Sequence, residues 1–547
     1  MCARFGITTT LALYLERRGF RADERLDRFL NPKLQQLTLP SEMADRDNAA
    51  RRLAQAIRTR EPVFVYGDYD CDGITSAAIL TEVIEALGGS VTTGLASRFA
   101  GGYGLSSQAV DRVLDSEARL LVTCDCGSSD HESLRRVREA GLDAIVIDHH
   151  LVPDEPLPAL AFLNPHRPDC GFAYKGLASC GLVLSIAAAL RRELGRSLDV
   201  RRWLDLVAIG TIADVAPLDG DNRALVSAGL RSLEQAARPA VRALKELAEL
   251  DAGTKLSARD VAFKLAPRIN APGRLRSPEL ALELLLAKDT DTATALAAEI
   301  EQLSSERKLQ QVAIIDAAVR QIEERGWVDS PALVLGERDW NHGVVGIAAG
   351  RLANRYQRPV IVVGFEGDHG RGSVRGPRGT RLFDLLERSE DLLLRFGGHQ
   401  AAAGLEVDYA RLPDLRERFV NTCKEAQAGA PSVAVDEEVE CLHLHADDDP
   451  TRLMRDLMLL EPCGESNPSP KVLMRARVVN AREVRGGHLK LELESASGCR
   501  LGGFGIDMGE RAEALEGFVE LVGELCPDRW RGGDAVELRV ERIDASG

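Results

Sequence analysis

The chain has 547 residues and is 45% hydrophobic, which is enough for about three domains with sizeable cores. Its net charge of −15 argues against a protein that passively coats nucleic acid, because such proteins are basic overall. The 11 cysteines have no regular spacing, and neither a secretory signal nor a membrane-length apolar run is present. We therefore expect a reduced, cytoplasmic protein without a membrane segment.

Residues 1–60 are helical and rich in arginine, and are expected to lead into the first sheet. The first strong motif follows in Val65-Tyr-Gly-Asp-Tyr-Asp-Cys-Asp-Gly73. It places Asp68, Asp70 and Asp72 at alternate positions, between a short apolar strand and a helix-like run. Carboxylates this closely spaced repel one another strongly unless a cation lies among them.

Two more apolar runs end on acidic residues, one on Asp125 and the next on Asp148, His149 and His150. Short apolar runs that alternate with helical stretches predict buried parallel strands joined by crossover helices. Ligands of such open sheets bind beyond the carboxyl ends of the strands, so we expect all three clusters at one edge. Asp214 ends a further apolar stretch and could reach the same place.

Many carboxylates with one or two imidazoles suit Mn²⁺ or Mg²⁺ better than zinc. One ion rarely needs so many acidic ligands, whereas two ions that share a bridging carboxylate do. Paired ions of this kind are commonly used to hydrolyse phosphate esters. A solvated acidic turn is the alternative for one cluster, but three clusters with one layout favour a two-metal phosphoesterase.

The Asp148-His149-His150 triplet, with the Asp70 to Asp72 and Asp125 clusters upstream, resembles the DHH phosphoesterase superfamily. Three longer segments, the first of which contains the Asp70 to Asp72 cluster, resemble the RecJ family of single-strand-specific 5′-to-3′ DNA exonucleases: Gly67-Asp-Tyr-Asp-Cys-Asp-Gly-Ile-Thr-Ser76, Pro267-Arg-Ile-Asn-Ala-Pro-Gly-Arg274 and Gly397-Gly-His-Gln-Ala-Ala-Ala-Gly404. The resemblance covers essentially the whole chain. It implies a metal-dependent exonuclease that degrades single-stranded DNA from the 5′ end to mononucleotides, in DNA repair and recombination.

The resemblance also implies an α/β fold with a parallel-sheet DHH catalytic domain, a long connecting helix, a DHHA1-like α/β domain and an OB-like β-barrel. Residues 290–324 contain strong helix formers and neither Gly nor Pro, which predicts one long helix, although a helix pair with an unmarked turn is the alternative. Alternating runs near the C-terminus predict the barrel. The expected boundaries are 1–60 for the lead-in, 61–289 for the catalytic domain, 290–325 for the helix, 326–428 for the DHHA1-like domain and 432–547 for the barrel.

Roles for individual residues follow from the resemblance, which implies two metal ions bridged by Asp125. One ion would be held by Asp68, Asp70 and Asp125. The other would be held by Asp72, Asp125, His149 and Asp214. His150 is expected to contact the scissile phosphate, and Asp148 to orient an imidazole as its hydrogen-bond partner.

Candidate substrate-binding residues are donors and an aromatic side chain that lie near glycines. They are Arg98, Tyr103, Arg268, Asn270, Arg274, Ser373, Arg375 and His399. Arginine can bind phosphate through two parallel hydrogen bonds, and Tyr103 could stack on a base. Residues 351–381 also contain seven arginines and only two acidic residues, which indicates a track for the phosphate backbone or a solvated basic face.

Two segments depart from the family pattern. In Trp340-Asn-His-Gly343 the histidine stands one position later than expected, so His342 is left out of the predicted site. Glu465 and Ser466 stand where a glycine is expected.

Two rival functions remain open: an enzyme for small substrates such as short oligonucleotides or nucleotide phosphates, and a scaffold with an inactive site. The extra barrel argues against the first and the intact acidic cluster against the second. Single-stranded DNA is the expected partner. A single-strand-binding protein and a helicase are further candidates, and a monomer is expected.

Overall fold

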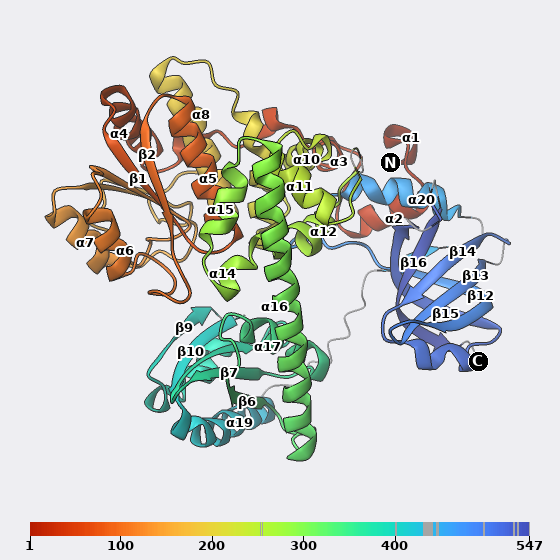
Figure 1. Ribbon diagram of the computed structural model, residues 1–547. Helices are drawn as coiled ribbons and strands as arrows, with labels where there is room; N and C mark the ends of the chain where they lie inside the picture. The colour runs from red at the N-terminus through yellow and green to blue at the C-terminus, as the bar shows by residue number, and fades with distance from the viewer. Residues whose placement is uncertain are drawn as a thin grey trace.

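The computed structural model consists of two α/β units and a barrel, with one long helix between the two α/β units (Figure 1). The first α/β unit corresponds to the expected catalytic domain and is called the catalytic unit, and the other is called the second unit. The structure describes residues 1–251, 253, 255–399, 402–429, 441–444, 448–495, 498–528, 531–532 and 535–545. This architecture confirms the expected fold class. The expected boundary between residues 428 and 432 falls largely outside the described residues.

Five parallel strands form the sheet of the catalytic unit, in the order β2-β1-β3-β4-β5. Their bounds are Pro62–Gly67 (β1), Ser90–Leu95 (β2), Leu120–Cys124 (β3), Asp143–Ile147 (β4) and Ala161–Leu163 (β5). The inner strands β1, β3 and β4 are buried almost throughout, which explains why they read as continuous apolar runs.

Helices cover both faces of this sheet. Val65, Val122 and Ile147 pack in a core with helices that include α4 (Arg46–Thr59), α5 (Cys71–Ala86), α8 (Ser179–Leu194) and α9 (Leu204–Ala213). On the other face, Tyr66 and Val146 pack with α6 (Ser107–Leu114) and α7 (His131–Glu139). Further helices complete the unit: α10 (Gly220–Gln235), α11 (Pro239–Leu247), α12 (Ala258–Asp260), α13 (Ala266–Ile269), α14 (Pro272–Leu275) and α15 (Glu279–Leu286).

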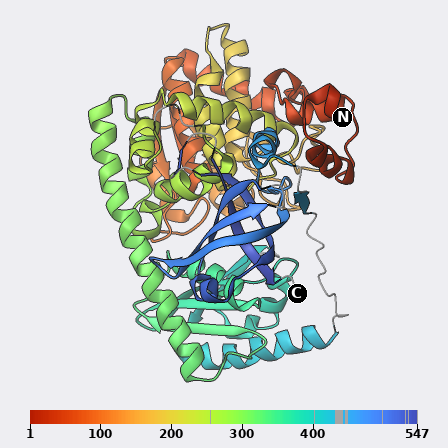
Figure 2. The same ribbon diagram turned by 90° about the vertical axis from the view of Figure 1, so that its right-hand side faces the viewer.

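The connecting helix α16 runs without interruption over Thr290–Glu324, so the alternative of a helix pair is excluded. Asp289 caps its first turn by accepting a hydrogen bond from the Thr292 backbone N–H. The first half of α16 packs into the catalytic core, and the second half packs into a core of the second unit. In the view turned by 90°, α16 runs along both units (Figure 2).

The second unit contains a mixed sheet in the order β6-β7-β8-β10-β9, in which only β6 and β7 pair in parallel. Its strands are Leu333–Arg338 (β6), Val360–Glu366 (β7), His369–Arg375 (β8), Arg395–His399 (β9) and Ala402–Asp408 (β10). Its helices are α17 (Val345–Tyr356), α18 (Leu382–Glu387) and α19 (Leu412–Gly429). Helix α17 packs with α16 on one face of the sheet, and α18 and α19 cover the other.

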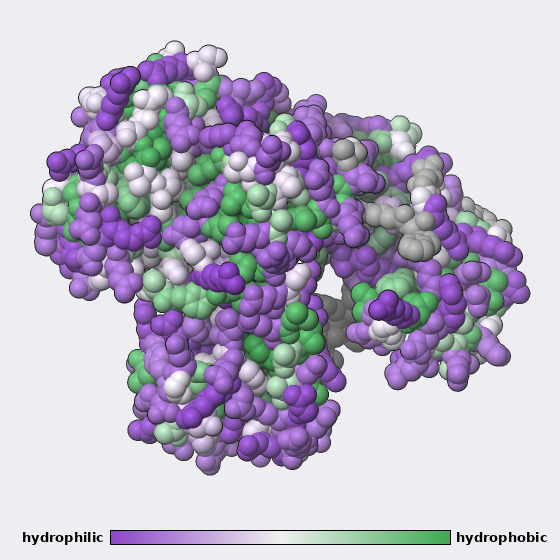
Figure 3. Space-filling view, viewed as in Figure 1, coloured by the Kyte–Doolittle hydropathy of each residue, from purple (hydrophilic) through white to green (hydrophobic). Residues whose placement is uncertain are grey.

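The C-terminal barrel is closed by pairing of β12 with β15. Its elements are β11 (Leu442–Leu444), α20 (Pro450–Leu457), β12 (Val472–Val484), β13 (His488–Ser495), β14 (Arg500–Gly505), β15 (Phe518–Pro527) and β16 (Val536–Ala545). The pair β14–β16 is parallel, so the barrel is mixed and not purely antiparallel. The space-filling view shows a mostly hydrophilic face and a gap between the second unit and the barrel (Figure 3).

The N-terminal segment does not serve as a simple lead-in to the first sheet. Helix α4 and the preceding Met43 pack in the catalytic core, whereas α1 (Cys2–Phe5), α2 (Thr9–Arg17) and α3 (Glu24–Leu30) share a hydrophobic core with the barrel. The Thr8 backbone N–H also donates to Asp456 of α20. Leu11 and Leu15 are buried against the barrel, which removes their apolar surface from water. The local sequence pattern alone does not tell which element these residues contact. Among the described residues, no helix is long and apolar enough to cross a membrane.

Candidate active site

Three acidic strand ends meet at the carboxyl edge of the catalytic sheet. Asp68, Asp125 and Asp148 follow the adjacent strands β1, β3 and β4, and each backbone N–H continues the ladder by donating to the last residue of the neighbouring strand. Asp125 has a φ of 65°, a region that residues other than glycine seldom adopt. Such a conformation persists only where the surrounding contacts hold it, and strained residues of this kind often lie at functional sites.

Two helix N-termini hold two of the three carboxylates of the first motif, those of Asp70 and Asp72. Asp70 caps α5, with its Oδ1 accepting from the backbone N–H groups of Asp72 at 3.0 Å and Gly73 at 3.1 Å. Asp72 is fully buried and accepts from the backbone N–H groups of Ser179 at 2.7 Å and Cys180 at 3.0 Å, at the start of α8. Donors at helix N-termini stabilise negative charge, so these contacts fix the carboxylates in place.

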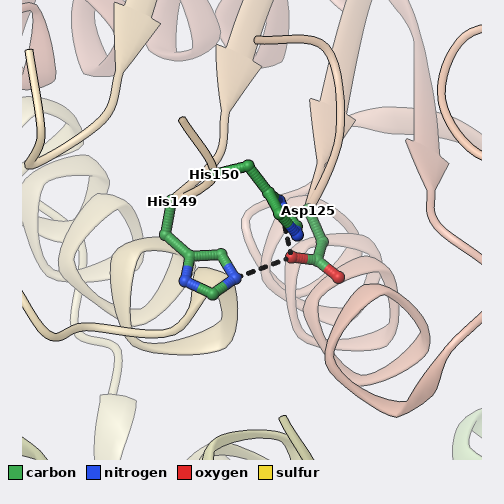
Figure 4. Close-up of side chains that lie close together, drawn as sticks. All are labelled: Asp125, His149 and His150. Carbon is green, nitrogen blue, oxygen red and sulfur yellow. Dashed lines mark ion pairs between the residues drawn. The ribbon is translucent and has the colours of Figure 1, made fainter. Parts of the chain in front are cut away.

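The two histidines face Asp125 from the end of β4 (Figure 4). His149 Nε2 lies 3.3 Å from Asp125 Oδ1 and 3.7 Å from Asp214 Oδ2, while His150 Nδ1 lies 3.9 Å from Asp125 Oδ1. His150 Nδ1 is also 2.7 Å from Asp148 Oδ1, so Asp148 orients that imidazole. The Asp148 carboxylate further accepts from the Ser128 backbone N–H at 3.0 Å.

Possible ligand atoms within 4.8 Å of one another form three groups in the described residues. They are Asp68, Asp70 and Asp125; Asp72, His149 and Asp214; and Asp125, His149 and His150. Two buried atoms in these groups, Asp68 Oδ1 and His149 Nε2, have no hydrogen-bond partner among the described residues. Buried polar atoms are normally paired, so these atoms fit a site that binds divalent cations through carboxylate and imidazole ligands.

The electrostatics of the cluster also fit bound cations. Burial, together with the charges of Asp72 and Asp70, raises the pKa of Asp125 well above its usual range and that of Asp214 to about 9. Burial lowers the pKa of His149, which keeps the imidazole neutral and able to act as a ligand. Burial alone would raise the pKa of Asp148, but the hydrogen bond and charge of His150 lower it to about 2.

A cleft of about 660 Å³ lies beside this cluster, between the catalytic unit and the second unit. Among the residues that the structure describes, five arginines and a single glutamate line it: Arg98, Arg274, Arg371, Arg375, Arg395 and Glu406. Of the predicted substrate residues, Arg98, Tyr103, Arg274, Ser373 and Arg375 line the cleft. An excess of guanidinium groups in one cleft is typical of a site for a polyanion such as a nucleic-acid backbone.

Contacts within the cleft arrange these side chains. The Arg98 guanidinium lies 3.8 Å from the centre of the Tyr69 ring, and Arg375 Nη1 donates to Ser373 Oγ at 2.7 Å. Tyr103 is turned towards the metal-ligand cluster, with its hydroxyl 3.0 Å from His150 Nδ1 and donating to the Asp125 carbonyl at 3.3 Å. Tyr103 therefore joins the cleft to the acidic cluster.

Arg268 and Asn270 are not among the cleft-lining residues. Arg268 instead pairs with Glu301 of α16 at 2.5 Å and donates to the carbonyls of Lys264 and Leu247, so the structure gives it a structural role. Asn270 lies at the end of α13. The side chain of His399 lies outside the described residues.

Several cleft residues could not be predicted from the sequence, among them Arg371, Arg395 and His342. Arg371 belongs to the basic run noted in the sequence, but no motif singled it out. His342 was left out because its spacing departs from the family pattern, yet it lines the cleft. Only the packing of the two units against each other identifies these residues.

Comparisons with known proteins cover all three units. Residues 62–211 match the DHH family N-terminal domain, residues 329–425 the DHHA1 domain, and residues 442–542 the RecJ OB domain. The chain is 35% identical over 545 residues to the single-stranded-DNA-specific exonuclease RecJ of Bacillus subtilis, covering 98% of this chain and 68% of that protein. It is 35% identical over 556 residues to the protein of that name from Dickeya dadantii, covering 97% and 95%.

The fold is also similar to solved structures. Crystal structures of RecJ from Thermus thermophilus match with a TM-score of 0.83 in the Mn²⁺ complex and 0.76 in the Mg²⁺ complex. Sequence identity is 32% and 30%, the matches cover 100% of this chain, and they cover 77% and 76% of those chains.

Proposed function

Because this chain belongs to the RecJ family of single-stranded-DNA-specific exonucleases, we propose that it is a metal-dependent exonuclease for single-stranded DNA. It would degrade the strand from the 5′ end to mononucleotides and act in DNA repair and recombination. The observation that carries the proposal is the cluster of buried carboxylates and imidazoles beside an arginine-lined cleft.

Two Mn²⁺ or Mg²⁺ ions are the proposed cofactors, since relatives of this family were crystallised with either ion. One ion would be held by Asp68, Asp70 and Asp125, and the other by Asp72, Asp125, His149 and Asp214. When bound, such a pair of ions supplies an activated water and neutralises the charge of the phosphate.

The chain's own residues hold and align the substrate. Asp148 fixes the His150 ring by a 2.7 Å contact, so that this imidazole can contact the scissile phosphate. Burial would lower the pKa of His150, but its hydrogen bond to Asp148 raises it to about 9, which favours a cationic ring opposite an anion. Arg274, Ser373 and Arg375 are proposed to hold the terminal 5′ phosphate, and the cleft is proposed to admit one strand.

Product analysis tests this proposal. A 5′-labelled single strand incubated with Mn²⁺ should release labelled mononucleotide first, and EDTA should abolish the reaction. Shortening from the 3′ end, or equal cutting of blunt duplex, would refute the polarity or the strandedness. Cleavage confined to dinucleotides would favour the small-substrate rival, and binding without metal-dependent cleavage would favour the scaffold.

Arg375→Ala tests the role of the phosphate contact. The variant should no longer cleave a 5′-phosphorylated strand more efficiently than a 5′-hydroxyl strand. The reason is that a charge-assisted hydrogen bond contributes about 1.5–3 kcal/mol, or roughly ten- to a hundredfold in cleavage efficiency. Mn²⁺ binding by calorimetry should stay unchanged. Arg201→Ala is the matched control, since this exposed arginine pairs with Asp199 outside the cleft. A preserved 5′-phosphate preference in Arg375→Ala would contradict the assignment.

The single-strand-binding protein and the helicase stay predictions, as do the monomeric state and the cytoplasmic location. Co-purification on single-stranded DNA and sedimentation velocity would test the partners and the monomer.

A further inference from the structure

Helix α16 carries three buried polar side chains between Ile300, which packs in the catalytic core, and Ile314, which packs in the second unit. They are Ser304, Arg307 and Gln311, whose exposed fractions are 1%, 8% and 5%. Because they follow one another at intervals of three and four residues, they share one face of the helix. Helix α16 packs here against α14 of the catalytic unit and α17 of the second unit. None of the three residues lines the cleft, so the proposed exonuclease site leaves them without a role.

The Arg307 guanidinium has one free hydrogen-bonding edge. Its Nη1 donates to Gln311 Oε1 at 3.2 Å, which orients the group. Its Nε is buried and has no hydrogen-bond partner among the described residues, and the same part of the chain offers no partner to Nη2. The N–H groups of Nε and Nη2 lie side by side in one plane, and this arrangement binds two oxygens of a phosphate group.

The Ser304 hydroxyl is a second unpaired donor. It is buried and has no hydrogen-bond partner in the residues that the structure describes. A serine inside a helix can bond to the carbonyl of the preceding turn, but Ser304 does not do so. Ser304 lies three residues before Arg307 on the same face, so the hydroxyl and the guanidinium are spaced to contact one ligand. Native proteins seldom leave buried polar groups unpaired, and two neighbouring ones indicate a ligand.

The charges around Arg307 indicate that this ligand is an anion. Within the described part of the chain, Arg307 forms no ion pair with a carboxylate. Burial, followed by the charges of Arg351 and Arg268, lowers the pKa of Arg307. Arg268 is paired with Glu301, whereas the exposed Arg351 of α17 has no carboxylate partner among the described residues. Burying a cation costs free energy unless an anion compensates its charge, so a doubly charged anion fits beside Arg307 and Arg351.

We propose that Arg307, Ser304 and Arg351 form a binding site for a phosphate dianion at the junction of the two α/β units. Arg307 binds two phosphate oxygens through Nε and Nη2, the Ser304 hydroxyl donates to the phosphate, and Arg351 adds positive charge from the exposed side. The phosphate is either free inorganic phosphate or that of a released nucleotide, which the proposed function would generate near Arg274 of the neighbouring α14. The site itself goes beyond that function, because its residues lie outside the cleft lining.

Calorimetric titration with inorganic phosphate in EDTA tests the site without cations or DNA. The full chain carries Arg375→Ala, so that the proposed phosphate contact in the cleft does not contribute. Phosphate should bind, and adding Arg307→Gln should weaken binding about ten- to a hundredfold, because charge-assisted hydrogen bonds are lost. Arg320→Gln is the matched control, since this exposed arginine lies farther along the same helix, and it should leave the affinity unchanged. Absence of phosphate binding, or binding that survives Arg307→Gln, overturns the site.

Two milder variants keep the site testable if Arg307→Gln does not fold. Ser304→Ala removes only a hydroxyl and should weaken phosphate binding about three- to tenfold. Arg351→Gln changes an exposed side chain, so the fold should be retained while phosphate binding weakens by a similar factor. Phosphate should also raise the Tm relative to chloride at equal ionic strength, and both variants should reduce this rise. Unchanged affinity in both variants refutes the site.

A second titration, with a deoxynucleoside 5′-monophosphate, identifies the source of the phosphate. Tighter binding of the nucleotide, weakened by Arg307→Gln, assigns the site to the reaction product, whereas equal or weaker binding assigns it to free phosphate. These outcomes are separate from the proposed function. If the chain binds phosphate through Arg307 but does not degrade DNA, the function is wrong and the site stands. If the chain degrades DNA and phosphate does not bind at Arg307, only the site is wrong.

Discussion

Proton release on cation binding offers a quantitative test of the metal centre, with Asp214→Asn as the perturbation. Asp214 ends α9, and its side chain is 19% exposed. Burial and the charges of Asp72 and Asp70 raise its pKa to about 9 in the absence of cations. At pH 7 the group is therefore protonated, whereas a cation ligand must be ionised, so binding of Mn²⁺ should displace about one proton from Asp214.

The magnitude follows from the distance between the pKa and the working pH. The pKa of about 9 lies two pH units above pH 7, so the cost of ionising Asp214 weakens cation binding at pH 7 by about 3 kcal/mol, or roughly a hundredfold. The ionisation of Asp214 alone should tighten the apparent affinity about tenfold per pH unit over this range. The stability of the cation-free fold changes in the opposite direction, because it falls as the pH rises. The neutral carboxyl stabilises the cation-free fold below the unfolded pKa of about 3.9, and this contribution is lost as the pH rises through about 9.

Calorimetric titration with Mn²⁺ at pH 7, in two buffers of different ionisation enthalpy, counts the protons released. Asp214→Asn should release about one proton fewer than the wild type. Protons released from Asp125 and Asp68 are counted in both proteins and do not enter this difference. Asp199→Asn is the control, since this exposed carboxylate pairs with Arg201 and should leave the count unchanged. Equal proton release by the wild type and Asp214→Asn would refute the reasoning.

Two further substitutions test other parts of the structure. Asp125→Asn should lower single-strand turnover by several orders of magnitude, because the proposed bridging ligand is lost, and retained turnover would contradict the role of Asp125. Thermal unfolding of this variant in EDTA should show no loss of stability, because the raised pKa already keeps the buried Asp125 carboxyl neutral without cations and the Asn side chain is neutral too. Arg268→Ala should lower the free energy of unfolding in urea by about 2–3 kcal/mol, because Glu301 loses its partner, and leave KM for DNA unchanged. A raised KM at unchanged stability would instead support the substrate role predicted from sequence.

The acidic centre could be predicted because parallel strands place their carboxyl ends at one edge, and Asp68, Asp125 and Asp148 each end such a strand. The cleft was predicted less well, because its residues come from two units whose relative placement no local pattern encodes. Arg268 lies in a motif with Arg274, yet one turn of helix directs it to Glu301 and away from the cleft. His342 was left out of the predicted site because of its spacing, although it lines the cleft. The burial of α2 against the barrel likewise depends on contacts between distant segments.

The geometry of the cleft depends on the number of residues in helix α16, because this helix joins the two units that form the cleft. Ala297 and Ile300 pack in the catalytic core, and Ile314 and Ala318 pack in the second unit, on one continuous helix. Each residue adds about 1.5 Å and about 100° of rotation. One residue inserted between Ile300 and Ile314 would turn the second unit by about 100° and carry Ser373 away from Arg274. Seven inserted residues would restore the facing to within about 20° but move the units apart by about 10 Å. Insertions and deletions in this helix are therefore constrained in two ways, because each one changes both the rotation of the second unit and its distance from the catalytic unit.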